Sequence, residues 1–249
     1  LVFITIAIPV QLDGNWVTLL WAGESALLFW IGRTKNVPVY ENLSYPLMIL
    51  AFFSITHDWI TLYDAYHPEN PETRITPLFN IIFLTSILFI AAFGFINILN
   101  SNRKYSAGLS IHKGISKIIS FIIPAILIFT IYYAFRMEIV TYWEQLYKDS
   151  ALIIRSNNQQ YPDYFQNYDL NKFKTVWVIN YSLFFVSLLA FVNFRKLKKQ
   201  QLGVISLCLI AFTLAIFLIQ GLYDLSELRE SYLEQTLSQY YHRGVFNIV

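Results

Sequence analysis

The chain has 249 residues, of which 56% are hydrophobic and only 14% are charged. Soluble domains carry about 45–50% apolar and about 25% charged residues, and the mean hydropathy of +0.47 departs in the same direction. Eighteen basic against sixteen acidic residues leave a net charge of +2, which is too balanced for a nucleic-acid binder. The composition excludes a soluble enzyme, a disordered tail and a disulfide scaffold, and it predicts a membrane protein whose main partner is the lipid bilayer.

Several apolar runs are long enough to cross a bilayer. A hydrocarbon core about 30 Å thick needs about 20 apolar residues at about 1.5 Å each, and in lipid the backbone must satisfy its own hydrogen bonds as a helix. Four uncharged runs meet or nearly meet this length: residues 78–99, 118–135, 175–194 and 202–223. Residues 16–31 and 45–63 are weaker runs, and residues 1–10 look like the end of a truncated helix. The predicted fold class is therefore all-α, a polytopic transmembrane helix bundle of about seven spans.

The domain prediction places this bundle in residues 1–223 and an amphipathic tail in residues 224–249. In the tail, Asp224 and Glu227 have the spacing of a helix capping box. Residues 137–154 also place apolar side chains near helical spacing. This pattern predicts an amphipathic helix on the outer surface or an extension of the preceding span.

The orientation follows from the basic residues of the loops. The loops 32–44, 100–117 and 195–201 are more than twice as dense in Lys and Arg as the loops on the opposite side. Cytoplasmic loops carry an excess of Lys and Arg, so these three loops are predicted to face the cytoplasm. The chain is then predicted to be multi-pass, with the C-terminus outside.

Polar residues inside the predicted spans are the first candidates for function. Glu24 lies in the middle of the run 16–31, where a charged carboxylate costs a few kcal/mol unless it is neutral, paired or facing water. Its two interpretations are a proton-carrying or ligand-binding group and a hydrogen bond between helices. His57 and Asp58 form the next candidate pair. In one interpretation His57 contacts Glu24 of the neighbouring helix, and in the other both residues lie at the membrane interface.

The outer candidates are Asp13, which follows the first run, and a loop rich in Asn, Gln, Tyr and Asp. Its rings Tyr161, Tyr164 and Tyr168 are able to stack on a sugar or a peptide, or they simply cap the bundle. No metal site is predicted, because one His with two nearby Glu does not form a ligand set. No cofactor is predicted, since the motifs of phosphate loops and dinucleotide sites do not occur in the sequence. The single cysteine, Cys208, is predicted to be a small buried apolar residue.

One segment resembles a known family. Residues 8–33 read IPVQLDGNWVTLLWAGESALLFWIGR, with an Ile-Pro, a small or polar turn, a Trp-Ala-x-Glu helix and a Trp-x-Gly-Arg exit. This segment is similar to predicted bacterial membrane proteins grouped as domain of unknown function 2339. The matching positions are Ile8, Pro9, Gly14, Trp16, Trp21, Ala22, Glu24, Trp30, Gly32 and Arg33. The resemblance implies the C-terminal portion of a long multi-pass protein of a bacterial inner (cytoplasmic) membrane, and it implies no activity.

Three hypotheses for function follow. The first is an integral protein of unknown biochemical activity that is structural or handles a substrate in the cell envelope. Its partners would be envelope proteins or other helices of the same full-length chain, and the sequence shows no catalytic activity. The second is a transporter or channel-like module that uses Glu24. The third is an envelope enzyme that acts on lipid-linked sugars through Asp13 and the Tyr-rich loop.

Overall fold

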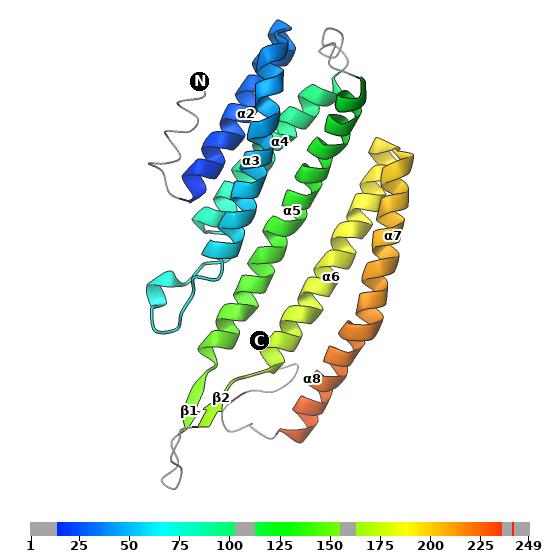
Figure 1. The fold of residues 1–249 in the computed structure, drawn as a ribbon. Helices are drawn as coiled ribbons and strands as arrows, with labels where there is room; N and C mark the ends of the chain where they lie inside the picture. Colours follow the sequence, from blue (N-terminus) through cyan, green and yellow to red (C-terminus); the bar gives the residue numbers. More distant parts are fainter. Residues whose placement is uncertain (1–13, 103–112, 155–162, 236–240, 242–249) are drawn as a thin grey trace. The chain divides into compact units, whose positions relative to one another are not determined.

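The computed structural model describes residues 14–102, 113–154, 163–235 and 241, and it is helical apart from one short hairpin (Figure 1). The helices are α2 (Asn15–Lys35), α3 (Pro38–Leu62), α4 (Ile81–Ser101), α5 (Lys113–Asp149), α6 (Asp169–Val192), α7 (Gln200–Ile216) and α8 (Leu222–Glu234). A 3-10 turn η1 (Pro71–Thr73) precedes α4, and two π-helical turns are η3 (Asn193–Leu197) and η4 (Phe217–Gly221). Strands β1 (Leu152–Ile154) and β2 (Asp163–Phe165) pair antiparallel.

Four helical runs of the described chain are long and apolar enough to cross a membrane. They are Ile81–Ser101, Ile118–Asp149, Asp169–Leu197 and Gln200–Glu234. The prediction of seven spans is therefore not supported. The segments 16–31 and 45–63 do form α2 and α3, but Glu24 in α2 and the His57–Asp58 pair in α3 lower their hydropathy. The predicted span at residues 1–10 lies outside the described residues.

Helix α5 continues through the segment for which the sequence left two alternatives. It runs from Lys113 to Asp149 as one helix of 37 residues, which corresponds to a length of about 55 Å. Residues 137–149 are thus an extension of the preceding span and not a separate surface helix. The helix ends because the chain turns at Ser150 into β1, where the Ser150 N–H still donates to the Leu146 carbonyl oxygen at 3.1 Å.

The C-terminal run is also continuous. η4 joins α7 to α8, and α8 begins after Gly221 with no side-chain cap. The predicted capping box is wrong, because Asp224 lies inside the helix and its Oδ1 accepts a hydrogen bond from Gln220 Nε2 at 3.1 Å. The predicted domain boundary between residues 223 and 224 falls within this uninterrupted helical run.

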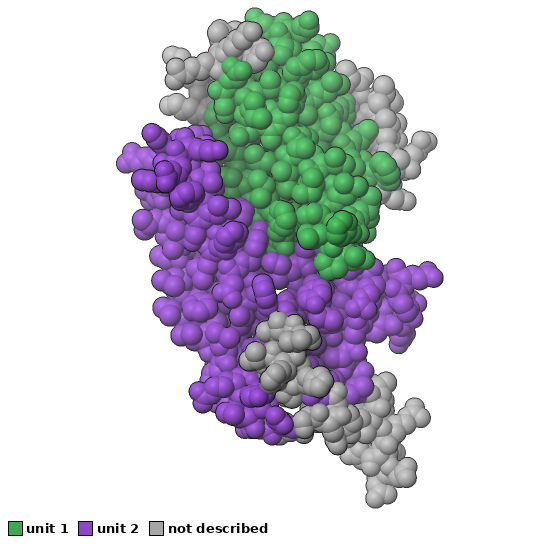
Figure 2. Space-filling view, turned by 180° about the vertical axis from the view of Figure 1, so that it is seen from behind, with its two compact units in different colours: residues 1–65, 76–137 green, residues 66–75, 138–249 purple. Residues whose placement is uncertain are grey.

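Contacts between residues divide the chain into two compact units (Figure 2). Unit 1 comprises residues 1–65 and 76–137, and unit 2 comprises residues 66–75 and 138–249. Helix α5 contributes to both, since the division falls between Met137 and Glu138.

In unit 1, α2 packs closely against α3 and α4. The face of α2 that is buried carries mostly small side chains, among them Thr18, Ala22, Ser25 and Ala26. Small residues at a helix interface allow backbones to approach closely. At Gly32 the approach is so close that a Cβ atom would lie 2.6 Å from the backbone nitrogen of Glu41. Glycine is therefore required where α2 ends beside the first turn of α3.

In unit 2, the C-terminal part of α5, the N-terminal part of α6 and α8 share an apolar cluster. It consists of Trp143, Leu170, Phe173 and Leu228. The rings of Trp143 and Phe173 stack with centroids 5.5 Å apart. The segment 66–75 is held to α5 by Gln145, whose amide donates to the Ile75 carbonyl oxygen at 3.1 Å and accepts from the Ile75 N–H at 3.2 Å.

Helix α7 is the least covered helix of the described chain. Within the run Gln200–Glu234, only 11% of the residues in its apolar 18-residue stretch are buried within the protein. Cys208 lies on this run and is exposed, so the prediction of a buried cysteine is wrong. The sequence places Cys208 in an apolar run, but such a run does not show whether a side chain is buried by protein or exposed on an apolar helix surface.

Candidate functional site

The predicted intramembrane candidates Glu24, His57 and Asp58 all lie on the α2–α3 pair of unit 1. The two helices run antiparallel, since Thr18 of α2 bonds to Asp58 near the end of α3, whereas Gly32 contacts Glu41 near its start. These two contacts fix the register of the pair. They also define two buried polar clusters, one near each end of the interface.

The first cluster consists of Thr18, Ser54 and Asp58. The Thr18 hydroxyl donates to Asp58 Oδ2 at 2.6 Å and lies 2.6 Å from the Ser54 hydroxyl. Thr18 is completely buried, and Asp58 is only 4% exposed. A buried carboxylate is costly unless hydrogen bonds satisfy it, so this interhelical contact ties Asp58 to α2.

His57 does not join that cluster. Its side chain is 75% exposed, and its Nδ1 lies 4.0 Å from Asp58 Oδ1. The structure does not bring His57 to Glu24: the register places Glu24 opposite the middle of α3, about two helical turns, or about 10 Å, from His57. The alternative in which His57 contacts Glu24 is therefore not supported, because the two residues are separated along the helix axis and the His57 side chain is exposed.

Glu24 is half-buried in α2 and has interaction partners within the protein. Its neighbours Ser25 and Ala26 are buried, and the Ser25 hydroxyl donates to the carbonyl oxygen of Ala22 at 2.9 Å. Glu24 therefore sits at the edge of the buried small-residue face and not at its centre.

The second cluster contains a carboxylate that the sequence analysis did not single out. Glu41 is 1% exposed. Its Oε1 accepts from Arg33 Nε at 2.8 Å and from the Tyr45 hydroxyl at 2.6 Å. Arg33 also donates from Nη2 to Asn100 Oδ1 of α4 at 3.2 Å, and its guanidinium lies over the Phe29 ring. Arg33 of α2 thus connects to α3 through the ion pair with Glu41 and to α4 through the hydrogen bond with Asn100.

A signal for this cluster was present in the sequence. Arg33 and Glu41 have opposite charges and stand eight residues apart, on either side of Val37-Pro38. Proline at the first position of a helix favours a new start there, and Asn36 adopts the left-handed conformation, with φ 56°, that ends α2. Two helices joined by so short a turn must bring these two side chains together.

A third polar contact joins α3 to α4. The buried Trp59 donates from Nε1 to the Ser86 hydroxyl at 2.9 Å. Its ring stacks on Tyr133 of α5 with centroids 5.3 Å apart. A buried indole N–H needs such a partner, and the contact extends the polar connections of α3 to a second neighbour.

The predicted outer candidates are only partly described. Asp13 and Tyr161 lie outside the described residues, and Tyr164 belongs to β2, for which the structure describes the backbone. Tyr168 is 62% exposed, and its ring centroid lies 5.9 Å from that of Tyr147. The described residues therefore do not show these four side chains gathered into one site.

The polar contacts of unit 2 are more exposed. Lys172 Nζ lies 3.2 Å from Glu227 Oε2, and Lys174 Nζ lies 3.1 Å from Glu144 Oε2. Deeper in, the Ser231 hydroxyl donates to Asp169 Oδ2 at 2.7 Å. In the segment 66–75, the Tyr66 hydroxyl donates to Asp149 of α5. This hydrogen bond raises the pKa of Tyr66 above its ordinary value.

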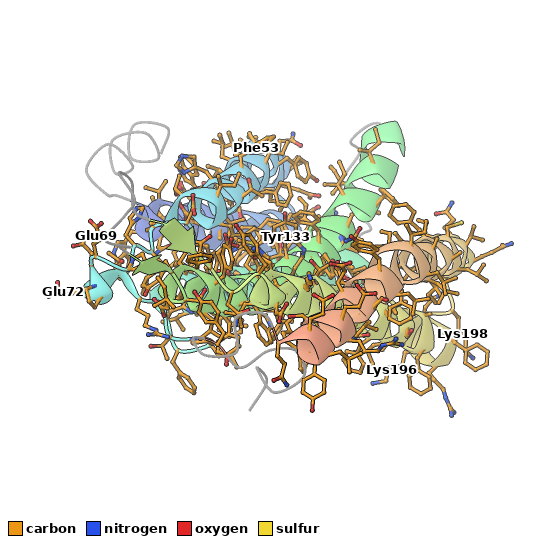
Figure 3. All side chains as sticks on the ribbon, turned by 90° about the horizontal axis from the view of Figure 1, so that it is seen from below. Phe53, Glu69, Glu72, Tyr133, Lys196 and Lys198 are labelled. Atoms are coloured by element: carbon orange, nitrogen blue, oxygen red, sulfur yellow. The ribbon has the colours of Figure 1, made fainter. Side chains whose placement is uncertain are left out.

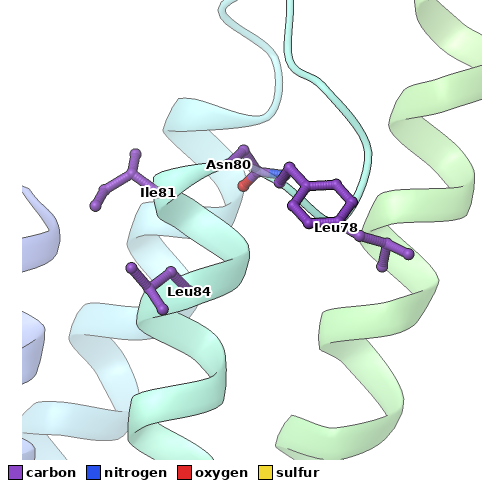
Figure 4. A pocket seen from close by; sticks show the side chains of 5 residues that line it. Leu78, Asn80, Ile81 and Leu84 are labelled. Atoms are coloured by element: carbon purple, nitrogen blue, oxygen red, sulfur yellow. The ribbon is translucent and has the colours of Figure 1, made fainter.

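One open surface pocket of about 370 Å³ lies at the start of α4 (Figure 4). Its lining residues are Leu78, Phe79, Asn80, Ile81 and Leu84. The Asn80 amide is engaged, because Oδ1 accepts from the Phe83 N–H at 2.7 Å and Nδ2 donates to the Thr76 carbonyl oxygen at 3.1 Å. The pocket therefore offers hydrocarbon and no catalytic group. Within the described residues, no three His, Cys, Asp or Glu side chains are grouped to hold a metal ion.

These features define a class: a helical protein with four helical runs long and apolar enough to span a membrane, in which α2 and α3 are joined by two buried polar clusters. Comparison of the chain with protein-family models, with curated proteins and with solved structures finds no match. The resemblance of residues 8–33 to domain of unknown function 2339 thus stays a prediction. The structure nevertheless gives two of its positions a physical role, since Gly32 permits the close approach to Glu41 and Arg33 binds its carboxylate.

Proposed function

We propose that the chain is a multi-pass integral protein of a bacterial inner membrane, with its C-terminus outside, and that the α2–α3–α4 helices serve as a structural module of the cell envelope. The observation that carries this proposal is that the two buried carboxylates at the α2–α3 interface are bonded to side chains of the neighbouring helix. Asp58 accepts from Thr18, and Glu41 accepts from Arg33. Carboxylates bonded in this way hold neighbouring helices together.

Two further features support the membrane assignment and its orientation. Four helical runs have the required length and hydropathy. The turn between α6 and α7 carries four exposed basic residues, Arg195, Lys196, Lys198 and Lys199, as expected of a cytoplasmic loop. Envelope proteins, or other helices of a longer chain, are the partners that a module of this kind would hold.

The proposal is tested by placing the whole chain in vesicles of phosphatidylcholine and asking whether it stays with them during flotation and alkaline extraction. An integral protein remains with the lipid. Release of the chain by alkali would overturn the membrane assignment. The structural role is tested by an assay of proton or solute flux in the same vesicles, where we expect no flux above that of empty vesicles.

The transporter hypothesis is the second candidate, because Glu24 is a half-buried acid in the middle of a helix. It predicts flux that Glu24→Gln abolishes while the protein stays folded. Glu69→Gln, which removes the same charge from an exposed position in the segment 66–75, is the matched control. Flux that disappears in the Glu24 variant and persists in the control would replace the structural proposal with this one.

A further inference from the structure

The turn between α6 and α7 concentrates positive charge. Arg195, Lys196, Lys198 and Lys199 supply four of the eighteen basic residues within five successive positions, although the whole chain has a net charge of only +2. We call these four residues the basic turn. All four are exposed, and none forms an ion pair with another described residue. Figure 3 shows Lys196 and Lys198 at the edge of the α6–α7 hairpin.

The backbone that carries the basic turn is fixed by Asn193. This residue is 7% exposed. Its Nδ2 donates to the Lys199 carbonyl oxygen at 3.0 Å, and its Oδ1 accepts from the Lys199 N–H at 3.1 Å. The Lys198 N–H donates to the Asn193 carbonyl oxygen at 2.7 Å, and Lys198 takes the left-handed conformation with φ 50°. A fixed backbone reduces the entropy lost when a ligand binds.

Apolar side chains surround the basic turn. Phe191, Phe194 and Leu197 are 56%, 77% and 46% exposed. They belong to the end of one candidate span, Asp169–Leu197, and the next begins at Gln200. The Arg195 guanidinium lies 5.5 Å from the centroid of the Phe191 ring. Long basic side chains at the ends of spans extend toward the membrane interface, so the cations lie where hydrocarbon meets lipid headgroups.

We propose that the basic turn binds the phosphodiester headgroups of anionic phospholipids. The inference rests on the proposed membrane insertion and adds the class of lipid that one leaflet must supply. Four cations with no counterion among the residues that the structure describes attract a surface of net negative charge, whereas a zwitterionic headgroup offers no net charge in return. The exposed rings beside the cations contact the acyl chains of the same lipids, which selects a lipid headgroup over a free anion.

The test uses the whole chain in nanodiscs that contain phosphatidylcholine with a minor fraction of phosphatidylglycerol of identical acyl chains. Native mass spectrometry of the ejected protein measures which lipid stays bound. We expect the bound lipid to be enriched in phosphatidylglycerol. In the double variant Lys196→Gln/Lys198→Gln at low salt, we expect this preference to fall by about fivefold for each cation removed. The double variant Lys35→Gln/Arg229→Gln removes equal charge from exposed sites elsewhere, and it should keep the preference.

Further outcomes sharpen the test. Asn193→Ala keeps all four charges but frees the turn, so it should weaken the preference less than the double variant does. Equal retention of both lipids by a protein that is inserted in the bilayer would overturn the proposal while leaving the membrane assignment intact. Displacement of phosphatidylglycerol by millimolar glycerol phosphate would overturn it too, since the turn would then recognise a soluble anion. A chain that fails to enter nanodiscs contradicts the membrane assignment itself.

Discussion

Two ion pairs of similar length lie in different surroundings. Arg33–Glu41 in unit 1 and Lys174–Glu144 in unit 2 have N···O distances of 2.8 and 3.1 Å. The side chains of the first pair are 9% and 2% exposed, and those of the second are 25% and 39% exposed. Water screens the second pair and competes for it, whereas the first has only protein partners. The comparison teaches that burial, and not distance, decides which contact holds its helices together.

The largest effect is expected from Arg33→Ala. The variant leaves the Glu41 carboxylate buried without a counterion, and breaking such a pair from one side costs about 3–5 kcal/mol. Unfolding of the detergent-solubilised protein measures the loss. The double variant Arg33→Ala/Glu41→Leu removes both charges and should recover a substantial part of it. A single variant as stable as the wild type would contradict the importance of this pair.

Substitution at Gly32 tests the close approach on which that pair depends. In Gly32→Ala the new methyl group would lie 2.6 Å from the Glu41 backbone nitrogen, so α2 and α3 must separate. Overpacking of this kind costs about 1–3 kcal/mol. Gly23→Ala is the matched control on the same helix, because a Cβ there meets no atom within 4 Å. It should stabilise the helix by about 0.5–1 kcal/mol. Equal effects of the two variants would refute the argument.

The other end of the interface is tested by Thr18→Val, which keeps the shape of the side chain and removes its hydroxyl. Asp58 then loses the donor at 2.6 Å, and an unsatisfied buried acceptor costs about 1–3 kcal/mol. Thr61→Val, at an exposed residue whose hydroxyl bonds only to carbonyl oxygens of its own helix, serves as the control. Thermal unfolding of both variants in the same detergent compares them, and the Thr18 variant should be the less stable.

The smallest effect is expected from Lys174→Met. Exposed ion pairs contribute about 0–1 kcal/mol, so unfolding should change little, and the small change should vanish at high salt because ions screen exposed charges. The Arg33→Ala loss should persist at the same salt concentration. A salt-insensitive loss at Lys174 as large as the loss at Arg33 would remove the distinction between the two regions.

Much of the fold follows from local sequence. The apolar runs 78–99 and 175–194 predicted α4 and α6, and three of the four helix ends lie within a few residues of the predicted ones. An apolar run in lipid has few alternatives to a helix. The prediction was less accurate for α5, since the apolar criterion stops near Arg136 whereas the helix continues to Asp149. Polar residues form the same backbone hydrogen bonds as apolar ones, so hydropathy alone does not locate the end of a helix.

The candidate site was harder to predict. Asp58 was named as a candidate, but its partner Thr18 stands 40 residues away. Glu41 was not named, although it is the most buried acid of the α2–α3 interface. Both partnerships depend on the register between two helices. The sequence signals the short turn at Asn36 that pairs Arg33 with Glu41, but it does not show the close approach beside Gly32 that sets the register farther along the two helices.

The exposed thiol of Cys208 gives this chain a built-in probe of depth. It is the one cysteine in the sequence and lies within α7, so a maleimide would modify the protein at one known position without any engineering. If α7 crosses the bilayer, a membrane-impermeant maleimide leaves the thiol untouched in intact vesicles and reacts only after the protein is unfolded. The natural sequence therefore carries its own reporter of whether hydrocarbon or water surrounds this helix.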